Sequence, residues 1–425
     1  MHNLVNRIAS ARRSSQEREM ESSPPNRPRL PRTVWVLGIV SLLMDLSSEI
    51  YHALLPAFLT VTLGLPVAAM GALDGIAEGT ANLAKLASGK LSDRQQRRKP
   101  WILLGYGMAA LSKPLFPLAN GVIPLLGARF VDRVGKGIRG APRDAMIADE
   151  TPPELRGRAF GLRQSLDTVG AFLAPLVAVG LMFWLAGDIR MVFWIAVIPA
   201  FLSFGFAWAM LREDRSKAPL QAKIKWAGFR DLDPAVKRLI GVGFLFGLAR
   251  FSESFLILKA MDVGVSAALS PLVLTLFSLS FLLLAYPAGI LSDRIAPRSV
   301  LLGGIALLVV ANLVLADANS LVMVGLGVGL WGAHMALTQG IFSRMIADAA
   351  GEDRRATSFG AFFFVSGIAA LLSSLGAGLI WDRDGASATF MAGAVLAAVA
   401  GAMVWLLPSG SSGTATSGPP PDPDQ

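Results

Sequence analysis

Long apolar runs are the feature that most constrains this chain. Twelve runs of about 20 to 30 residues can be read along it, and a bilayer core about 30 Å thick needs roughly 20 apolar residues for each helical crossing. The 425 residues are 53% hydrophobic and 16% charged, whereas soluble domains carry about 25% charged residues. The sequence therefore predicts an all-α membrane protein with twelve transmembrane helices. The predicted spans are residues 34–63, 68–90, 101–119, 123–148, 159–184 and 190–211, followed by 235–262, 268–291, 299–317, 321–347, 356–381 and 387–407.

Polar segments divide the chain into five predicted parts. These are a basic tail at 1–33, a six-helix bundle at 34–211, a central loop at 212–234, a second six-helix bundle at 235–407 and a disordered tail at 408–425. Lys and Arg are concentrated in the first tail, in the connection after the second span and in the central loop. Short loops rich in these residues stay on the cytoplasmic side. We expect a multi-pass protein of the inner membrane with both termini in the cytoplasm.

The two predicted bundles share sequence markers. The tetrapeptide LSDR occurs at 91–94 and 291–294, and the tripeptide IAD occurs at 147–149 and 346–348. Both markers recur at nearly the same offset, which indicates duplication of a six-helix unit. Because six spans is an even number, the two copies have the same topology and form parallel repeats.

The connection after the second span, GKLSDRQQRR at 89–98, resembles the signature of the major facilitator superfamily of secondary transporters, although Gln96 replaces its second glycine and Ala296 does so in the second copy. The resemblance implies that the acid of this signature meets the amino-terminal end of span 11 in one conformation and releases it in another. An anion is stabilised near that end of a helix. The alternative is that these charges only obey the positive-inside rule. The predicted latch consists of Gly89, Asp93, Arg94, Arg97, Arg98, Asp293 and Arg294.

Three further patterns occur in spans 4 and 5. Arg129, followed by Gly135 and Gly137, resembles a family pattern whose arginine is implicated in proton transfer. Span 5 partly resembles a pattern enriched in exporters, with Ala174 where a glycine is expected. The stretch GKGIRG at 135–140 satisfies G-x-G-x-x-G, but a dinucleotide fingerprint requires a preceding strand. We interpret these glycines as helix-packing positions.

Ionisable residues inside the spans point to a polar interior. Each would cost about 2.5 to 3.5 kcal/mol at the bilayer centre, so they must face one another or water. Those in spans 2 and 4 recur every three or four residues, which places each set on one helical stripe. Acids and bases balance, so internal salt bridges that specify packing are an equally open interpretation. The predicted substrate cavity comprises Asp74, Glu78, Lys85, Asp132, Arg133, Lys136, Arg139, Asp167, Arg250 and His334.

Proton coupling is predicted at acids in the first span of each half. LSSE at 46–49 and FSES at 251–254 occupy similar places in the two repeats, so Glu49 and Glu253 are predicted repeat mates. Intramembrane carboxylates serve as proton relays in transporters. The predicted proton-coupling residues are Asp45, Glu49, Arg129 and Glu253. We interpret His334 as a packing residue rather than a proton or metal site.

These features predict a secondary active transporter that works by alternating access. The first hypothesis is proton-coupled export of a small organic molecule by antiport, and the alternative is proton symport of an anionic metabolite or a siderophore-like ligand. A non-transporting receptor is a third hypothesis. With no Cys, three His and no nucleotide motif, we predict neither an enzyme nor a cofactor. The expected partners are the lipid bilayer, a small-molecule substrate and protons; the protein is expected to be a monomer and, despite its net charge of +9, not to bind nucleic acid.

Overall fold

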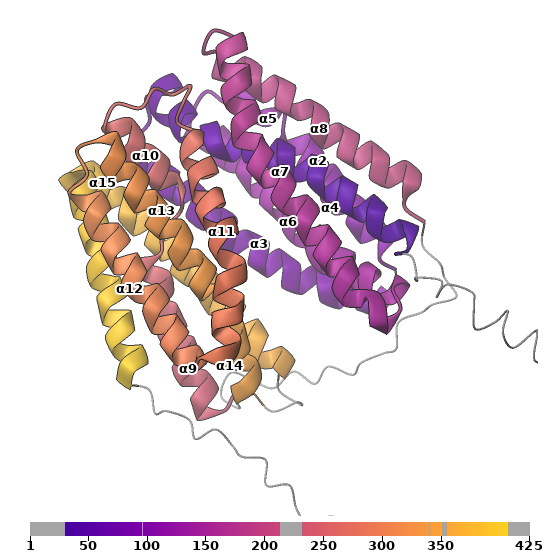
Figure 1. Ribbon diagram of the computed structural model, residues 1–425. Helices are drawn as coiled ribbons and strands as arrows, with labels where there is room; N and C mark the ends of the chain where they lie inside the picture. The colour runs from indigo at the N-terminus through magenta and orange to yellow at the C-terminus, as the bar shows by residue number, and fades with distance from the viewer. Residues whose placement is uncertain (1–29, 96, 213–231, 340, 351–354, 407–425) are drawn as a thin grey trace, which may run out of the picture.

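The computed structural model describes residues 30–95, 97–212, 232–339, 341–350 and 355–406, and in this part of the chain the regular structure is entirely helical (Figure 1). The first half holds α2 (Arg32–Ala57), the π-helix η1 (Phe58–Thr62), α3 (Val67–Gln95), α4 (Lys99–Ser112), α5 (Leu115–Leu118), α6 (Val122–Glu150), the short η2 (Pro153–Leu155), α7 (Arg156–Trp184) and α8 (Ile189–Met210). The second half holds α9 (Pro234–Ala249), α10 (Ser254–Asp262), α11 (Leu272–Arg294), α12 (Pro297–Ala316), α13 (Leu321–Thr338), α14 (Ile341–Ala349) and α15 (Arg355–Leu406). Most of the first predicted tail, the second predicted tail and most of the central loop lie outside the described residues, and α2 begins at Arg32, inside the predicted first tail.

Each predicted span coincides with helical structure, with four departures from twelve unbroken helices. The third span is interrupted between α4 and α5, the seventh between α9 and α10, and the tenth between α13 and α14. The eleventh and twelfth form the single element α15, which turns at Gly385, where φ is +86°. Glycine adopts this left-handed conformation without the penalty that a side chain imposes. An apolar pattern marks a span but does not report such local breaks.

Eight segments of the described chain are long and apolar enough to cross a membrane. One of them, Thr357–Leu406, has 50 residues, more than twice the length of a single crossing. Both α3 and α6 have 29 residues, which is also sufficient length, but their charged stripes lower their hydropathy. The all-helical membrane fold predicted from the sequence is confirmed.

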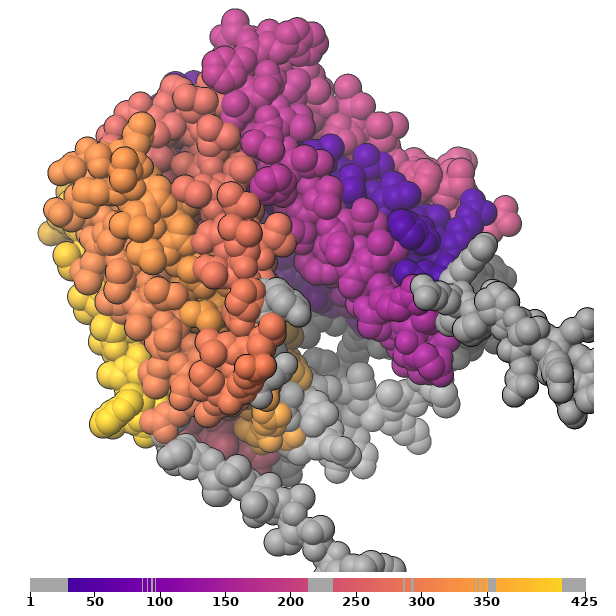
Figure 2. All heavy atoms as spheres, viewed as in Figure 1, coloured from indigo at the N-terminus to yellow at the C-terminus, as the bar shows by residue number. Residues whose placement is uncertain are grey.

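The helices form two bundles that lie side by side, α2 to α8 in one and α9 to α15 in the other (Figure 1). We call the end at which α2 begins and α15 ends the tail end, and the opposite end the far end. The bundles meet chiefly where α3 packs against α15, where α2 contacts α10 and where α7 contacts α11. Figure 2 shows the two bundles separating toward the tail end.

The outer surface carries large apolar side chains, as expected of a surface that faces lipid. Ile123, Val322, Trp184 and Trp208 are each at least two-thirds exposed. Inside the second bundle, by contrast, aromatic rings pack against one another, as Phe251 does against Trp331 in a tilted arrangement with 5.3 Å between centroids. Apolar groups therefore lie both on the outer surface and in the core of the second bundle.

At the far end, glycines of α3 allow the two bundles to come into close contact. The α3 positions Gly71 and Gly75 face α15, and a Cβ atom at Gly71 would lie 2.0 Å from the carbonyl oxygen of Ser374. At Gly75 it would lie 2.8 Å from the Cα atom of Leu371. Small residues at four-residue spacing let two helices approach closely in a membrane. The backbones of α3 and α15 are therefore in direct contact at this end.

Candidate functional site: a charged cavity between the bundles

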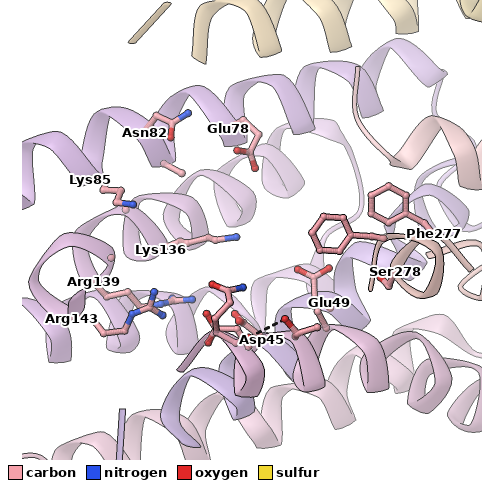
Figure 3. A pocket seen from close by; sticks show the side chains of 18 residues that line it. Asp45, Glu49, Glu78, Asn82, Lys85, Lys136, Arg139, Arg143, Phe277 and Ser278 are labelled. Atoms are coloured by element: carbon pink, nitrogen blue, oxygen red, sulfur yellow. Dashed lines mark hydrogen bonds between the residues drawn. The ribbon is translucent and has the colours of Figure 1, made fainter. Parts of the chain in front are cut away.

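A cavity of about 420 Å³ lies between the two bundles (Figure 3). Four helices of the first bundle, α2, α3, α6 and α7, supply most of its wall, and α11 supplies the part that belongs to the second bundle. The residues that line it are Asp45, Glu49, Glu78, Ala81, Asn82, Lys85, Lys136, Gly137, Arg139, Gly140, Arg143, Gln164, Asp167, Thr168, Ala171, Phe277, Ser278 and Phe281. Its walls differ in character, because the first bundle contributes the charges and α11 contributes two aromatic rings.

Seven of the residues predicted from the sequence for proton coupling or substrate binding come together in this cavity. They are Asp45, Glu49, Glu78, Lys85, Lys136, Arg139 and Asp167. Those from α2, α3 and α6 recur at three- and four-residue spacing, so each helix presents one polar stripe to the cavity. The roles predicted for these residues stay predictions.

Four of the charged side chains that line the cavity already have a partner in the first bundle. The pairs are Glu49 with His52 at 3.1 Å, Glu78 with Arg133 at 3.6 Å, Asp167 with Arg163 at 3.0 Å and Arg143 with Asp144 at 3.2 Å. These contacts offset much of the local charge. The chemistry open to a ligand is therefore set by the groups that have no such partner.

Within the described part of the chain, the unpartnered charges that line the cavity are Asp45, Lys85, Lys136 and Arg139. Lys85 and Lys136 are exposed to the cavity. Arg139 is only 4% exposed, and its buried Nη1 has no hydrogen-bond partner. Its guanidinium lies 4.6 Å from the centroid of the Tyr106 ring. Among the described residues, three cations and one carboxylate of the cavity thus remain without an ion-pair or hydrogen-bond partner.

Two predicted residues, Asp74 and Arg129, form a buried pair that does not line the cavity. The distance from Arg129 Nη2 to Asp74 Oδ1 is 3.0 Å, and both residues are less than 5% exposed. The other carboxylate oxygen accepts hydrogen bonds from the hydroxyls of Ser252 and Ser254, the latter at 2.6 Å. These serines belong to the second bundle. Asp74 therefore connects the two bundles between the cavity and the far end.

A second buried pair involves Lys113, which the sequence analysis missed. Lys113 Nζ donates to Asp132 Oδ1 at 2.9 Å and to Ser48 Oγ at 3.0 Å, and Lys113 is 1% exposed. Asp132 also lies 3.7 Å from Arg133, so both of these predicted cavity residues belong to a buried network rather than to the cavity wall. Lys113 is the only charged residue in the predicted span 101–119. A single charge in an otherwise apolar span indicates a buried partner, and this was the sequence feature that could have identified it.

Arg250, Glu253 and His334 do not line this cavity either. Arg250 and Glu253 lie at the break between α9 and α10. His334 is fully buried, and its ring meets those of Phe246 and Trp331 edge-on at 5.8 Å and 6.2 Å. The environment of His334 is that of a packing residue, although neither ring nitrogen has a side-chain partner.

The latch residues lie at the tail-end turns of both halves. The side chains of Asp93, Arg94 and Asp293 lie outside the described part of the structure. Arg98 donates to Asp149 at 3.3 Å and to Ser92 at 2.9 Å, within the first bundle. Gly89 faces α6, where a Cβ atom would lie 3.3 Å from that of Ala141, and Arg97 and Arg294 are exposed. The latch stays a prediction.

No group of three or more metal-ligating side chains occurs among the described residues. The cavity consequently offers ion pairing, hydrogen bonding and aromatic contact to a ligand. The two bundles that enclose it are in direct backbone contact at the far end.

Comparison with known proteins places this arrangement in a family. The chain is 31% identical over 399 residues to an uncharacterised MFS-type transporter of Methanocaldococcus jannaschii, which covers 92% of this chain and 99% of that protein. It is 30% identical over 164 residues, 38% of this chain and 34% of the other, to a probable L-galactonate transporter of Escherichia coli. Among solved structures, a nucleoside transporter aligns over 88% of this chain and 99% of its own, with a TM-score of 0.73 at 15% identity. The Major Facilitator Superfamily model matches twice, at residues 37–261 and 239–423. This chain is therefore a membrane transporter of the Major Facilitator Superfamily.

Proposed function

We propose that this transporter carries a small organic anion together with a proton, by alternating access of the central cavity. The observation that carries the proposal is the set of unpartnered charges, three cations against one carboxylate. The tail end, where the first bundle begins, carries the basic loops and is proposed to face the cytoplasm of the cell that holds this protein in its inner membrane. The cavity would then be open to the cytoplasm in the present conformation.

Arg139 gives the strongest support for an anionic substrate. A buried guanidinium without a hydrogen-bonded counter-ion is costly, and a carboxylate offers it two acceptor oxygens in matching geometry. Lys85 and Lys136 are exposed to the same cavity and add two ammonium groups. The partial similarity to a protein named as an L-galactonate transporter is in keeping with an anionic substrate.

Asp45 is the proposed proton carrier. It is the unpartnered carboxylate of the cavity, and it interacts electrostatically with the acid Asp167 and with the cations Lys136 and Arg139. When ionised, Asp45 competes with a substrate anion as the counter-ion of these two cations. When protonated, it leaves both cations to the substrate, so proton and anion bind best together. Such cooperative binding raises the population of the carrier that holds both proton and anion, the species that symport transports.

The two transport hypotheses differ in whether protonation of Asp45 strengthens or weakens substrate binding. A cationic substrate would bind best to ionised Asp45 and would exchange with the proton, which is the antiport expected of an exporter. The excess of unpartnered cations favours the anion, and with it symport into the cell. We therefore favour the uptake alternative over proton-coupled efflux.

Purified protein in liposomes tests the proposal. An inward proton gradient is imposed, and accumulation of labelled anionic, cationic and neutral organic solutes is followed in parallel. We expect an anion to accumulate and to bring protons with it. In a parallel set with the proton gradient reversed, accumulation of a cation in exchange for protons would instead establish antiport. Absence of flux for every class of solute would support a non-transporting receptor.

A further inference from the structure

The contribution of the second bundle to the cavity is aromatic. Phe277 and Phe281 lie one turn apart on α11, with Ser278 between them, and both rings are partly exposed. Figure 3 shows Phe277 and Ser278 across the cavity from Lys85 and Arg139. The charged wall and the aromatic wall therefore belong to different bundles and face one another.

The two rings differ from the other aromatic side chains around them. In the described part of the chain, neither Phe277 nor Phe281 makes a ring contact with another aromatic residue, whereas Phe251 of the same bundle packs against three rings. An aromatic face gains free energy from an offset or edge-on partner. Phe277 and Phe281 line the cavity with part of each ring exposed, so that part is available to a ligand, while the rings of the bundle core already contact one another.

The backbone that carries these rings is held firmly. A Cβ atom at Gly332 of α13 would lie 2.6 Å from the carbonyl oxygen of Phe277 and 3.2 Å from the backbone nitrogen of Phe281. Between them, the hydroxyl of Ser280 donates to the carbonyl of Gly329 at 2.6 Å. Because α11 is seated against α13 in this way, the two rings form a pre-positioned surface, which lowers the entropic cost of binding.

We infer that the transported anion carries a planar aromatic group, bound on Phe277 and Phe281 while its carboxylate binds Arg139 and Lys136. This inference rests on the proposed anion transport and names the substrate class. A cavity of about 420 Å³ is within the usual size range of small-molecule sites. One ligand of this kind contacts both bundles at once, so its binding favours their approach at the tail end.

Binding to the purified full-length protein tests the inference without requiring transport. The probes are benzoate, the polyhydroxylated anion gluconate and the aromatic cation benzylammonium, with dissociation constants measured by titration calorimetry. We expect benzoate to bind more tightly than either of the others. In the double variant Phe277→Leu/Phe281→Leu, the dissociation constant for benzoate should rise roughly 3- to 10-fold, while that for gluconate stays within about twofold.

Two further variants serve as controls. Phe183→Leu removes a ring that is 66% exposed on the outer surface, and it should leave benzoate binding unchanged. Lys136→Gln should weaken binding of both anions, whereas Arg158→Gln, an exposed base outside the cavity, should weaken neither. Melting temperatures of all variants show that each is folded, and leucine retains much of the apolar volume of phenylalanine.

Each outcome bears on the inference separately from the proposed function. Tighter binding of gluconate or benzylammonium than of benzoate, no binding of benzoate, or an unchanged benzoate affinity in the double variant would overturn the aromatic class. Proton-driven accumulation of a non-aromatic anion in liposomes would then leave the proposed function standing. Benzoate binding with the expected dependence on both rings, but without flux, would support the inference and contradict the proposed function.

Discussion

The carboxylate of Asp382 accepts a hydrogen bond from the backbone amide of Val67 at 2.9 Å, across the boundary between the two bundles. Its second oxygen accepts from the amide of Ala68 at 2.8 Å. These amides belong to the first turn of α3, where the partial positive charge of the helix lies. At the tail end, Asp93 of α3 is predicted to make the equivalent contact with the start of α15. The helix pair α3 and α15 thus carries Asp382 at the far end and Asp93 at the tail end.

Replacing Asp382 with Asn should make the far end open more readily. Asn keeps one acceptor oxygen but removes the negative charge at the helix terminus, which contributes about 0.3 to 1 kcal/mol, so the ratio of far-end-open to far-end-closed molecules should rise roughly 1.5- to 5-fold. Because the chain has no Cys, single cysteines at Val61 and Ser387, both exposed, can carry spin labels for distance measurement by pulsed electron resonance. Asp384→Asn, at an exposed neighbouring acid, is the matched control. An unchanged distance distribution in Asp382→Asn would show that this cap does not hold the far end closed.

The substitution Gly71→Ala should act in the same direction through sterics. The added methyl group would lie 2.0 Å from the carbonyl oxygen of Ser374, so α3 and α15 must separate to accept it. Gly205→Ala adds the same group to α8 where nothing lies within 4 Å. With the spin labels described above, Gly71→Ala should shift the population to longer distances and Gly205→Ala should not. Equal behaviour of the two variants would argue against direct helix contact at Gly71.

Breaking the pair of Lys113 and Asp132 should destabilise the fold. Removing one partner leaves a buried charge without compensation, which costs about 3 to 5 kcal/mol in buried pairs. Asp132→Asn should therefore lower the melting temperature strongly, and Asp132→Leu combined with Lys113→Met should recover most of the loss. Asp384→Asn breaks an exposed pair with Arg383 and should change stability by about 0.5 kcal/mol at most. A normal melting temperature in Asp132→Asn would assign this aspartate a role other than packing.

Asp45→Asn should uncouple transport from the proton gradient. The amide mimics the protonated carboxyl group, so exchange of labelled for unlabelled anion across the membrane should continue at roughly the original rate. Accumulation driven by a pH gradient should be lost. Asp384→Asn, far from the cavity, should retain both activities. If Asp45→Asn still accumulates the anion, another group carries the proton.

The periodicity of the sequence indicated which charged residues share a helix face, but not which residues form ion pairs with one another. The stripes of α3 and α6 followed from three- and four-residue spacing, and they brought Glu78, Lys85, Lys136 and Arg139 into one cavity. Spacing along one helix cannot show which neighbouring helix supplies a counter-charge. Asp74 therefore shared a predicted stripe with Glu78, although in the fold it contacts Arg129 and the serines of the second bundle.

The same limit explains the residues that the sequence did not single out. Asp382 is followed by an arginine at the edge of an apolar run, so it resembled a solvated loop charge; only the contact with α3 reveals its role as a cap. Phe277 and Phe281 lie in a uniformly apolar span. Whether such rings face lipid, core or cavity depends on how α11 is rotated, and that rotation is set by the close packing at Gly332.

Because the two walls of the cavity differ in chemistry, each bundle contacts a different part of a substrate. The helices α2, α3, α6 and α7 supply the charged side chains of the cavity, whereas a short stretch of α11 supplies the aromatic side chains that would contact the apolar part of a substrate. Substitutions in that stretch of α11 would change which anions bind, while the charged side chains of the first bundle stay the same. Diversification of cargo in related transporters would then require few substitutions, all of them confined to the less charged half of the molecule.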